Sequence, residues 1–161
     1  MSDSPRLEPD LVRDFVGKAH SDLARVRDLL QQQPALVNAA WDWGAGDWET
    51  ALGAAAHVGR RDIALLLLEH GARMDIFCAA MLGHLEIVRA TLAACPGATK
   101  WLGPHGIPLL KHAEAGGPTC GVAFDEQIVS QIPTEPHDVR LNCILTPTRW
   151  QCAAGPRAVL K

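Results

Sequence analysis

Histidines and loop carboxylates are the residues of this sequence best suited to catalysis or metal binding. There are seven histidines, of which His20 and His57 each lie one or two positions before a predicted break between helices. His105 and His112 are seven residues apart, and the others are His70, His84 and His137. The sequence has no H-E-x-x-H, H-x-H or mixed cysteine–histidine motif that would bring two ligands together. We therefore expect neither a metal site nor a cofactor, and His70 and His84 are assigned structural roles.

Motifs for nucleophilic catalysis and phosphate binding are also missing from the sequence. There is no G-x-S-x-G, and the glycine-containing turns at 44–46 and 103–106 lack the preceding strand and the following Gly-Lys-Ser/Thr of a phosphate-binding loop. Asp42, Asp47 and Glu49 could supply a carboxylate pair for general acid–base catalysis, but their loop does not fix the separation between them. We expect them to cap helices and form turns, and the chain to be no enzyme.

Composition and charge exclude several classes of partner. The 161 residues are 48% hydrophobic with a formal net charge of -3, and their basic residues form no blocks that would follow a phosphate backbone. No apolar run approaches the roughly 18 residues of a membrane span. Five cysteines without a C-x-x-C pair are typical of reduced thiols. With no apolar signal segment at the N-terminus, the sequence predicts a cytoplasmic protein that binds neither nucleic acid nor membranes.

Short paired helices are the elements that must position these side chains. Thr50 is a predicted helix cap, followed by small residues at 51–56 and a break at Gly59. An apolar helix over 62–68 then ends at Gly71. This pattern predicts two helices folded back on each other. The small side chains of the first allow close approach of a neighbour, and the apolar second helix is expected to be buried on both sides.

The same layout is predicted on both sides of this central pair. Asp10 to Ala19 forms an amphipathic helix, and Ser21 is expected to cap the helix that follows it. Between this pair and the central one lies a loop, 35–49, with three tryptophans. A further pair is predicted over 76–92, and a fourth hairpin begins at Gly106 to Gly116 without an obvious second helix. The fold class is therefore all-α.

The central residues carry a resemblance to a known family. The matching segments are Thr50-Ala51-Leu52, Ala54-Ala55, Gly59, Leu66 to Ala72, and Gly83-His84-Leu85-Glu86-Ile87-Val88. They resemble the T-P-L-H-x-A-A, x-x-G and L-L-x-x-G-A pattern of the ankyrin repeat family. The resemblance implies a solenoid of about four helical hairpins over residues 1–117. The breaks are less evenly spaced than the family's period of about 33 residues, and the histidine of T-P-L-H is Gly53, Phe77 and Leu110 in turn.

Residues 118–161 form an atypical C-terminal tail without repeat motifs. A helix over 125–132 would cover the last hairpin, and the alternation of Val139, Leu141, Cys143 and Leu145 is typical of a strand. The remainder is expected to be irregular. A rival interpretation is that this tail is foreign to the family, for instance through a reading-frame change near Gly116.

The resemblance also implies a function, which is non-catalytic binding of a protein partner on the concave surface of the repeats. The positions that would line this surface are those of the loop and those just before the helix breaks, namely Trp41, Asp42, Trp43, Asp47, Trp48, His57, Val58, Met81 and Leu82. The indoles favour contact with a partner because tryptophan is enriched at binding hot spots, and Met81 would add adaptable apolar surface.

Two alternatives remain open at this point. The tryptophan rings could instead pack over the first two hairpins, and different rings could take different roles. The chain could also be a small enzyme or ligand-binding protein with its pocket at the Trp41–Trp48 loop. That function would require His57 to meet one of Asp42, Asp47 or Glu49 around a closed cavity.

Overall fold

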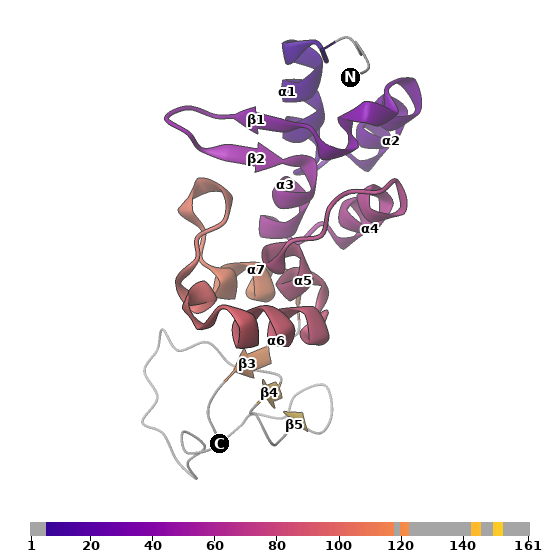
Figure 1. Ribbon diagram of the computed structural model, residues 1–161. Helices are drawn as coiled ribbons and strands as arrows, with labels where there is room; N and C mark the ends of the chain where they lie inside the picture. The colour runs from indigo at the N-terminus through magenta and orange to yellow at the C-terminus, as the bar shows by residue number, and fades with distance from the viewer. Residues whose placement is uncertain (1–5, 118–119, 123–142, 146–149, 153–161) are drawn as a thin grey trace. The chain divides into compact units, whose positions relative to one another are not determined.

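The computed structural model describes residues 6–117, 120–122, 143–145 and 150–152, and the chain divides into two compact units, Met1–Gly116 and Gly117–Lys161. The described residues are mostly helical, which confirms the all-α expectation in its coarse form (Figure 1). Short strands are added to the helices. Within this part of the chain, no helix has both the length and the hydropathy needed to cross a bilayer.

Residues up to Gly116 form three helix pairs and one further helix. The helices are α1 Pro9–Lys18, α2 Leu23–Gln32, α3 Ala51–His57, α4 Arg61–Glu69, α5 Ile76–Leu82, α6 Leu85–Ala94 and α7 Leu109–Ala115. Short 3-10 helices lie between them at η1 Pro34–Asn38, η2 Pro96–Lys100 and η3 Pro104–Gly106. The members of each pair, α1 with α2, α3 with α4 and α5 with α6, pack against each other.

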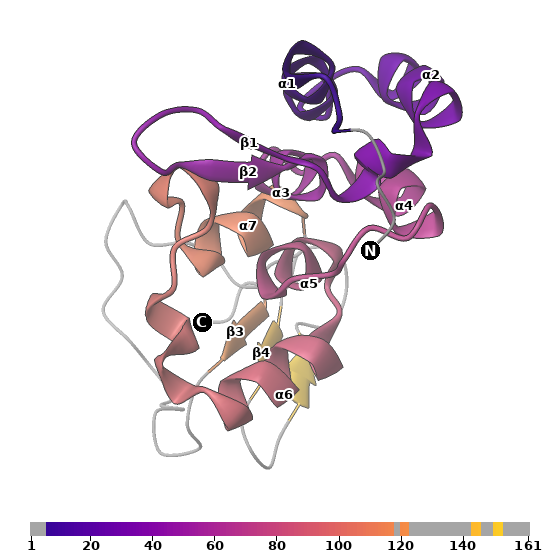
Figure 2. The same cartoon turned by 45° about the horizontal axis from the view of Figure 1, so that its top comes forward.

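Contacts between the pairs follow the order of the chain. The first helix of each pair packs against the first helix of the next, from α1 to α3, from α3 to α5 and from α5 to α7 (Figures 1 and 2). The second helices α2 and α4 also meet. One apolar core runs from α1 to α5, and a smaller one joins α5, α6 and η2.

The small side chains of α3 allow this close packing. Thr50 caps the helix, its Oγ1 accepting a hydrogen bond from the Gly53 backbone N–H at 3.0 Å, and every residue from Ala51 to Ala56 is buried. The neighbouring α4 is less enclosed than the sequence predicts. Leu65 is exposed, because only one face of that helix meets the core.

Two arginines connect the turn between α3 and α4 to the turns on either side. The Arg60 guanidinium donates to the backbone carbonyl of Ser21, in the turn between α1 and α2. The Arg61 guanidinium donates to the carbonyls of Met81 at 3.3 Å and Leu82 at 3.1 Å, at the end of α5. Successive turns are thus joined by hydrogen bonds between side chain and backbone.

The tryptophan loop folds as a β-hairpin. Strands β1 Ala40–Asp42 and β2 Trp48–Thr50 are antiparallel, with Trp41 opposite Glu49. Their connection runs through three successive residues of positive φ, Gly44, Ala45 and Gly46. Glycine at two of these three positions makes such a turn inexpensive.

The cap of α2 is Asp22, one residue beyond the predicted Ser21. The Asp22 carboxylate accepts a hydrogen bond from the Arg25 backbone N–H at 3.0 Å. A carboxylate at this position satisfies an otherwise unpaired donor and also interacts favourably with the helix dipole.

We expect Asp22→Ala to lower the free energy of unfolding by about 1 kcal/mol, because α2 loses its capping acceptor. Chemical denaturation of the full chain would measure this loss. Asp28→Ala is the matched control, since it removes the same charge from an exposed position within α2. Equal effects of the two substitutions would show that the cap contributes nothing.

The unit from Gly117 to Lys161 contains a small sheet with the order β3, β4, β5. Strand β3 Cys120–Val122 runs parallel to β4 Cys143–Leu145, and β4 is antiparallel to β5 Trp150–Cys152. The strand predicted from the alternation at 139–145 is therefore found at its C-terminal end, and residues 139–142 lie outside the described part. The helix predicted over 125–132 also lies outside it.

Candidate functional site

Three histidines and a glutamate from four segments of the chain meet at one point. We call them the histidine–glutamate cluster: His20, in the turn after α1; Glu49, the middle residue of β2; His57, the last residue of α3; and His105, within η3. One nitrogen or oxygen of each lies within 4.8 Å of those of the others. The hairpin brings Glu49 to the ends of α1 and α3, and the 103–106 turn adds the fourth side chain.

Glu49 is the centre of the cluster and is only 1% exposed. Its Oε2 accepts a hydrogen bond from the Trp43 indole Nε1–H at 2.6 Å, which orients the carboxylate. Its Oε1 lies 3.0 Å from His57 Nε2, 3.3 Å from His105 Nε2 and 3.6 Å from His20 Nε2. Burial opposes the charged form, but the hydrogen bonds from two histidines and the indole outweigh it and lower the pKa of Glu49 to about 2.

Two of the rings are oriented through their outer nitrogens. His20 Nδ1 donates to the Gly17 carbonyl at 3.0 Å, and His105 Nδ1 donates to Asp47 Oδ2 at 2.7 Å. A carbonyl or a carboxylate oxygen only accepts, so the proton must be on Nδ1 in both rings. Hydrogen bonding to the backbone N–H and then to the ring of His105 lowers the pKa of Asp47, which is therefore an ionised acceptor.

The turn that carries His105 rests directly on α3. Its backbone has φ values of +58° at His105 and +67° at Gly106, and the Gly103 backbone lies against the buried ring of His112. Pro104 is so close to Gly53 that a Cβ there would lie 3.1 Å from the proline ring. The small residue in α3 thus makes room for the turn that completes the cluster.

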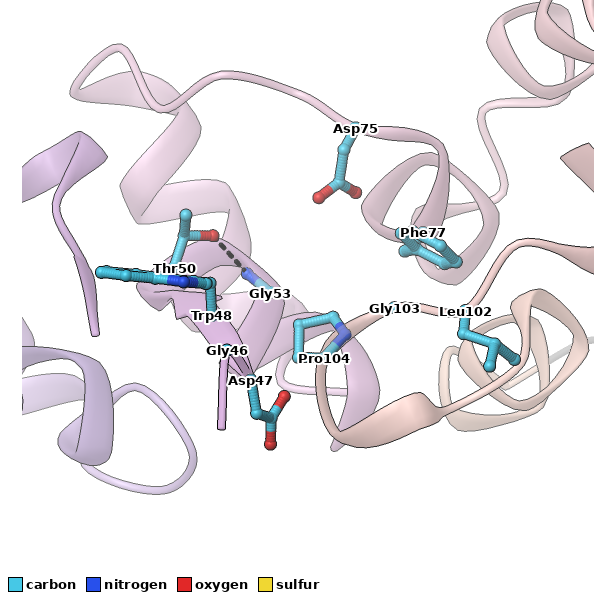
Figure 3. A pocket seen from close by; sticks show the side chains of 10 residues that line it. All are labelled: Gly46, Asp47, Trp48, Thr50, Gly53, Asp75, Phe77, Leu102, Gly103 and Pro104. Carbon is cyan, nitrogen blue, oxygen red and sulfur yellow. Dashed lines mark hydrogen bonds between the residues drawn. The ribbon is translucent and has the colours of Figure 1, made fainter. Parts of the chain in front are cut away.

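A pocket of about 360 Å³ lies beside the cluster, between the hairpin, the start of α5 and the 102–104 segment (Figure 3). In this view the rings of Trp48 and Phe77 lie on opposite sides of Pro104. Trp48 and Leu102 are each 62% exposed. The lining residues are Gly46, Asp47, Trp48, Thr50, Gly53, Asp75, Phe77, Leu102, Gly103 and Pro104.

The three loop tryptophans have three different environments. Trp41 is partly buried against the core, Trp43 hydrogen-bonds to Glu49, and Trp48 is mostly exposed beside the pocket. Of the loop aspartates, Asp42 forms the turn by accepting from the Gly44 N–H at 2.9 Å, whereas Asp47 holds His105. The ring of Trp41 therefore packs against the core, whereas the ring of Trp48 remains exposed to solvent.

The positions just before the helix breaks also differ from one another. His57 belongs to the cluster and Val58 is exposed. Met81 and Leu82 are buried, with exposures of 2% and 7%, because α5 packs against helices on several sides. The prediction that these two residues offer surface to a partner is wrong.

The other histidines in the described residues lie outside the cluster, at helix ends or within the protein interior. His70 Nδ1 donates to the Leu66 carbonyl at 2.8 Å, and His84 lies at the N-cap of α6. His112 is fully buried, its Nδ1 donating to the Pro108 carbonyl at 3.1 Å, and burial lowers its pKa. His137 lies outside the described residues.

The expectation that no histidines would converge is wrong for His20, His57 and His105. Sequence motifs detect ligands that are close together along the chain, whereas these come from three separate segments. One signal was present: His20 and His57 stand at equivalent places before the breaks of adjacent helix pairs, and such positions become neighbours when pairs stack. Glu49 was named only as one of three carboxylates that could meet His57, and His105 had no comparable signal.

Neither a protein-family model nor a curated protein sequence matches this chain.

Proposed function

We propose that this chain is an ankyrin-type repeat protein that binds a protein partner without catalysing a reaction. Three helix pairs whose first helices contact one another in chain order, with a β-hairpin between the first two pairs, support the ankyrin-type fold. In such stacked folds the exposed surface along successive repeats is used for binding. Here that surface includes the β1–β2 hairpin and the segment 102–104.

One observation carries the proposal: large apolar side chains are exposed around a preformed pocket. Trp48 and Leu102, each 62% exposed, line the 360 Å³ pocket together with Phe77 and Pro104. Soluble proteins rarely leave such groups together in water unless a partner covers them. Tryptophan in particular contributes a large contact area at low entropic cost.

The charges around the pocket indicate the chemistry of the partner. Asp47 and Asp75 line it, and the described lining residues include no lysine or arginine. A carboxylate next to aromatic rings favours an occupant that is both apolar and positively charged, since cations are attracted to aromatic faces and to carboxylates alike. We therefore propose a partner segment that combines an aliphatic or aromatic side chain with a lysine or arginine.

We expect peptides selected against the full-length protein from a random display library to share this composition, and Trp48→Ala to weaken their binding at least tenfold. The loss follows from the typical cost of more than 1 kcal/mol for truncating a tryptophan hot spot. Fluorescence anisotropy of the selected peptides would measure it. Trp101→Ala is the matched control, because Trp101 is 45% exposed but does not line the pocket. Enrichment of acidic peptides, or equal affinities of both variants, would contradict the proposal.

A second candidate function, a small enzyme or ligand-binding protein with its pocket at the Trp41–Trp48 loop, is favoured by one distance. His57 Nε2 lies 3.0 Å from Glu49 Oε1, within the range of proton transfer. However, neither residue lines the pocket beside Trp48, so the pair does not face a volume that would hold a substrate. Partner binding is therefore the preferred function.

A further inference from the structure

We infer that the histidine–glutamate cluster is a binding site for one divalent first-row transition metal ion, with zinc as the best match. The four ligand atoms are Glu49 Oε1 and the Nε2 atoms of His20, His57 and His105. This inference is independent of the partner proposed above, since it concerns the protein alone.

In the metal-free cluster, the proton positions of the neutral histidines conflict with the orientations of their rings. Neutral His20 and His105 carry their single proton on Nδ1, where it is donated to a carbonyl or a carboxylate. Their Nε2 lone pairs then face Oε1 of Glu49, an atom that also only accepts. With neutral rings, acceptor therefore faces acceptor beside the buried Glu49, which is unfavourable until protons or a cation at the centre remove the conflict.

Protonation of the rings would resolve the conflict only in part. His57 Nε2 lies 3.0 Å from His20 Nε2 and 3.0 Å from Glu49 Oε1, so one proton on it cannot serve both contacts. Protonating all three rings would place three positive charges around one carboxylate oxygen, with like charges within a few ångströms. A single divalent ion instead uses all four lone pairs at once.

The distances between the ligand atoms fit a tetrahedral ion. Ligands at the usual zinc–nitrogen and zinc–oxygen distances of about 2.0–2.1 Å are about 3.4 Å apart when the arrangement is tetrahedral. Four of the six separations are 3.0 Å for His20 to His57, 3.0 Å for His57 to Glu49, 3.3 Å for His105 to Glu49 and 3.6 Å for His20 to Glu49. The other two, from His105 to His20 and to His57, are within 4.8 Å. Four of the six pairs therefore lie within about 0.4 Å of the tetrahedral separation, and binding an ion requires the His105 ring to take its place between the other two.

Groups around the ligands have the arrangement that metal sites require. Metal-binding histidines almost always donate their second nitrogen to a carbonyl or a carboxylate, which is what His20 and His105 do through Gly17 and Asp47. The Trp43 indole N–H donates a hydrogen bond to Oε2 of Glu49, so the carboxylate would bind the metal ion through Oε1 alone. Three imidazoles and one carboxylate suit zinc and its neighbours better than magnesium or calcium, which prefer oxygen ligands.

Isothermal titration calorimetry with Zn²⁺, on the full chain after reduction of its cysteines and removal of metal by a chelator, tests the inference. We expect one equivalent to bind at pH 7.5 with a dissociation constant below roughly 1 µM, and excess zinc to raise the unfolding temperature by roughly 10 °C. The affinity should fall at least tenfold between pH 7.5 and pH 5.5, because protons compete for the same nitrogens. Co²⁺ in place of Zn²⁺ should give the visible absorption of four-coordinate nitrogen and oxygen ligation.

Two ligand variants and two control variants locate the ion. His105→Ala removes a half-exposed side chain from η3 and should weaken zinc binding more than 100-fold without unfolding the helices, and His57→Ala should do the same from α3. His70→Ala and His84→Ala remove the same side chain outside the cluster and should leave the affinity unchanged. Asp47→Asn, which weakens the positioning of His105, should cost about 10- to 100-fold.

Several results would overturn the inference. The folded chain could bind no zinc, in which case the cluster holds protons only. His105→Ala could retain wild-type affinity, and this variant decides the question even if His57→Ala does not fold. Absorption from thiolate-to-cobalt charge transfer in the near ultraviolet would assign the ion to cysteines instead.

Discussion

Glu49→Gln is expected to destabilise the metal-free protein by about 2–3 kcal/mol near pH 6. The carboxylate is 1% exposed, and its two oxygens face one indole and three imidazoles. Glutamine keeps the volume but removes the charge and replaces one acceptor by a donor. Removing one partner of a buried, charge-assisted pair costs about 3–5 kcal/mol. We expect a smaller loss here because the side chains of His20 and His105 are partly exposed.

The difference between wild type and Glu49→Gln should depend on pH. The pKa of Glu49 is lowered to about 2, so its contribution is complete above the unfolded value of about 4.3 and is lost as the pH falls toward 2. Hydrogen bonding to Glu49 raises the pKa of His20, so that contribution is complete below about 6.5 and is lost as the pH rises through the raised value. The difference should therefore be largest between about pH 4.5 and 6.5.

Chemical denaturation of both proteins from pH 3 to pH 9 in the presence of a chelator would measure this difference. Glu69→Gln is the matched control, because Glu69 is an ionisable residue at the end of α4, outside the cluster. A difference that is constant over the whole pH range would show that the histidines do not interact with Glu49. Added zinc should reverse the trend at high pH, where unprotonated imidazoles bind the metal best.

Gly59→Ala is expected to destabilise the protein by about 3 kcal/mol, the second large effect. Gly59 has a φ of +74°, and a Cβ on it would collide with the carbonyl oxygen of Ala115, at the end of α7. The left-handed backbone alone costs a non-glycine residue about 1–2 kcal/mol, and the overlap with a backbone atom adds a similar amount.

Gly71→Ala separates these two contributions. Gly71 has a φ of +89°, and nothing lies within 4 Å of the place where its Cβ would be. We expect a loss of about 1 kcal/mol, so the excess of Gly59→Ala over Gly71→Ala measures the close approach of α7. Thermal unfolding of the two variants side by side provides the comparison. Equal losses would mean that α7 moves aside without cost.

Local signals in the sequence predict much of the helical structure. Thr50 was expected to start a helix and Gly59 to break it, and both do so because capping and left-handed backbone depend on the residue itself. The small side chains of α3 likewise indicated close packing. Asp22, rather than Ser21, caps α2, since either side chain could reach the helix and only the final path of the chain selects one.

The candidate site could not be predicted in the same way. Glu49 looked like a turn-forming residue because its role depends on the β-hairpin, and short strands of three residues leave little pattern. His105 reaches the cluster from a turn that packs closely on Gly53, where a Cβ would lie 3.1 Å from the Pro104 ring. Met81 was expected at the surface, but it belongs to the apolar core that runs from α1 to α5, and which face of α5 is covered depends on the packing of the whole unit.

The arginine pair between α3 and α4 has a mechanical consequence. Arg60 hydrogen-bonds to the turn between α1 and α2, and Arg61 hydrogen-bonds to the end of α5. Tension applied to the two ends of residues 6–116 would pass through these guanidinium groups as well as through the apolar contacts. The turn between α3 and α4 is therefore the place where force on one helix pair is transmitted to the next.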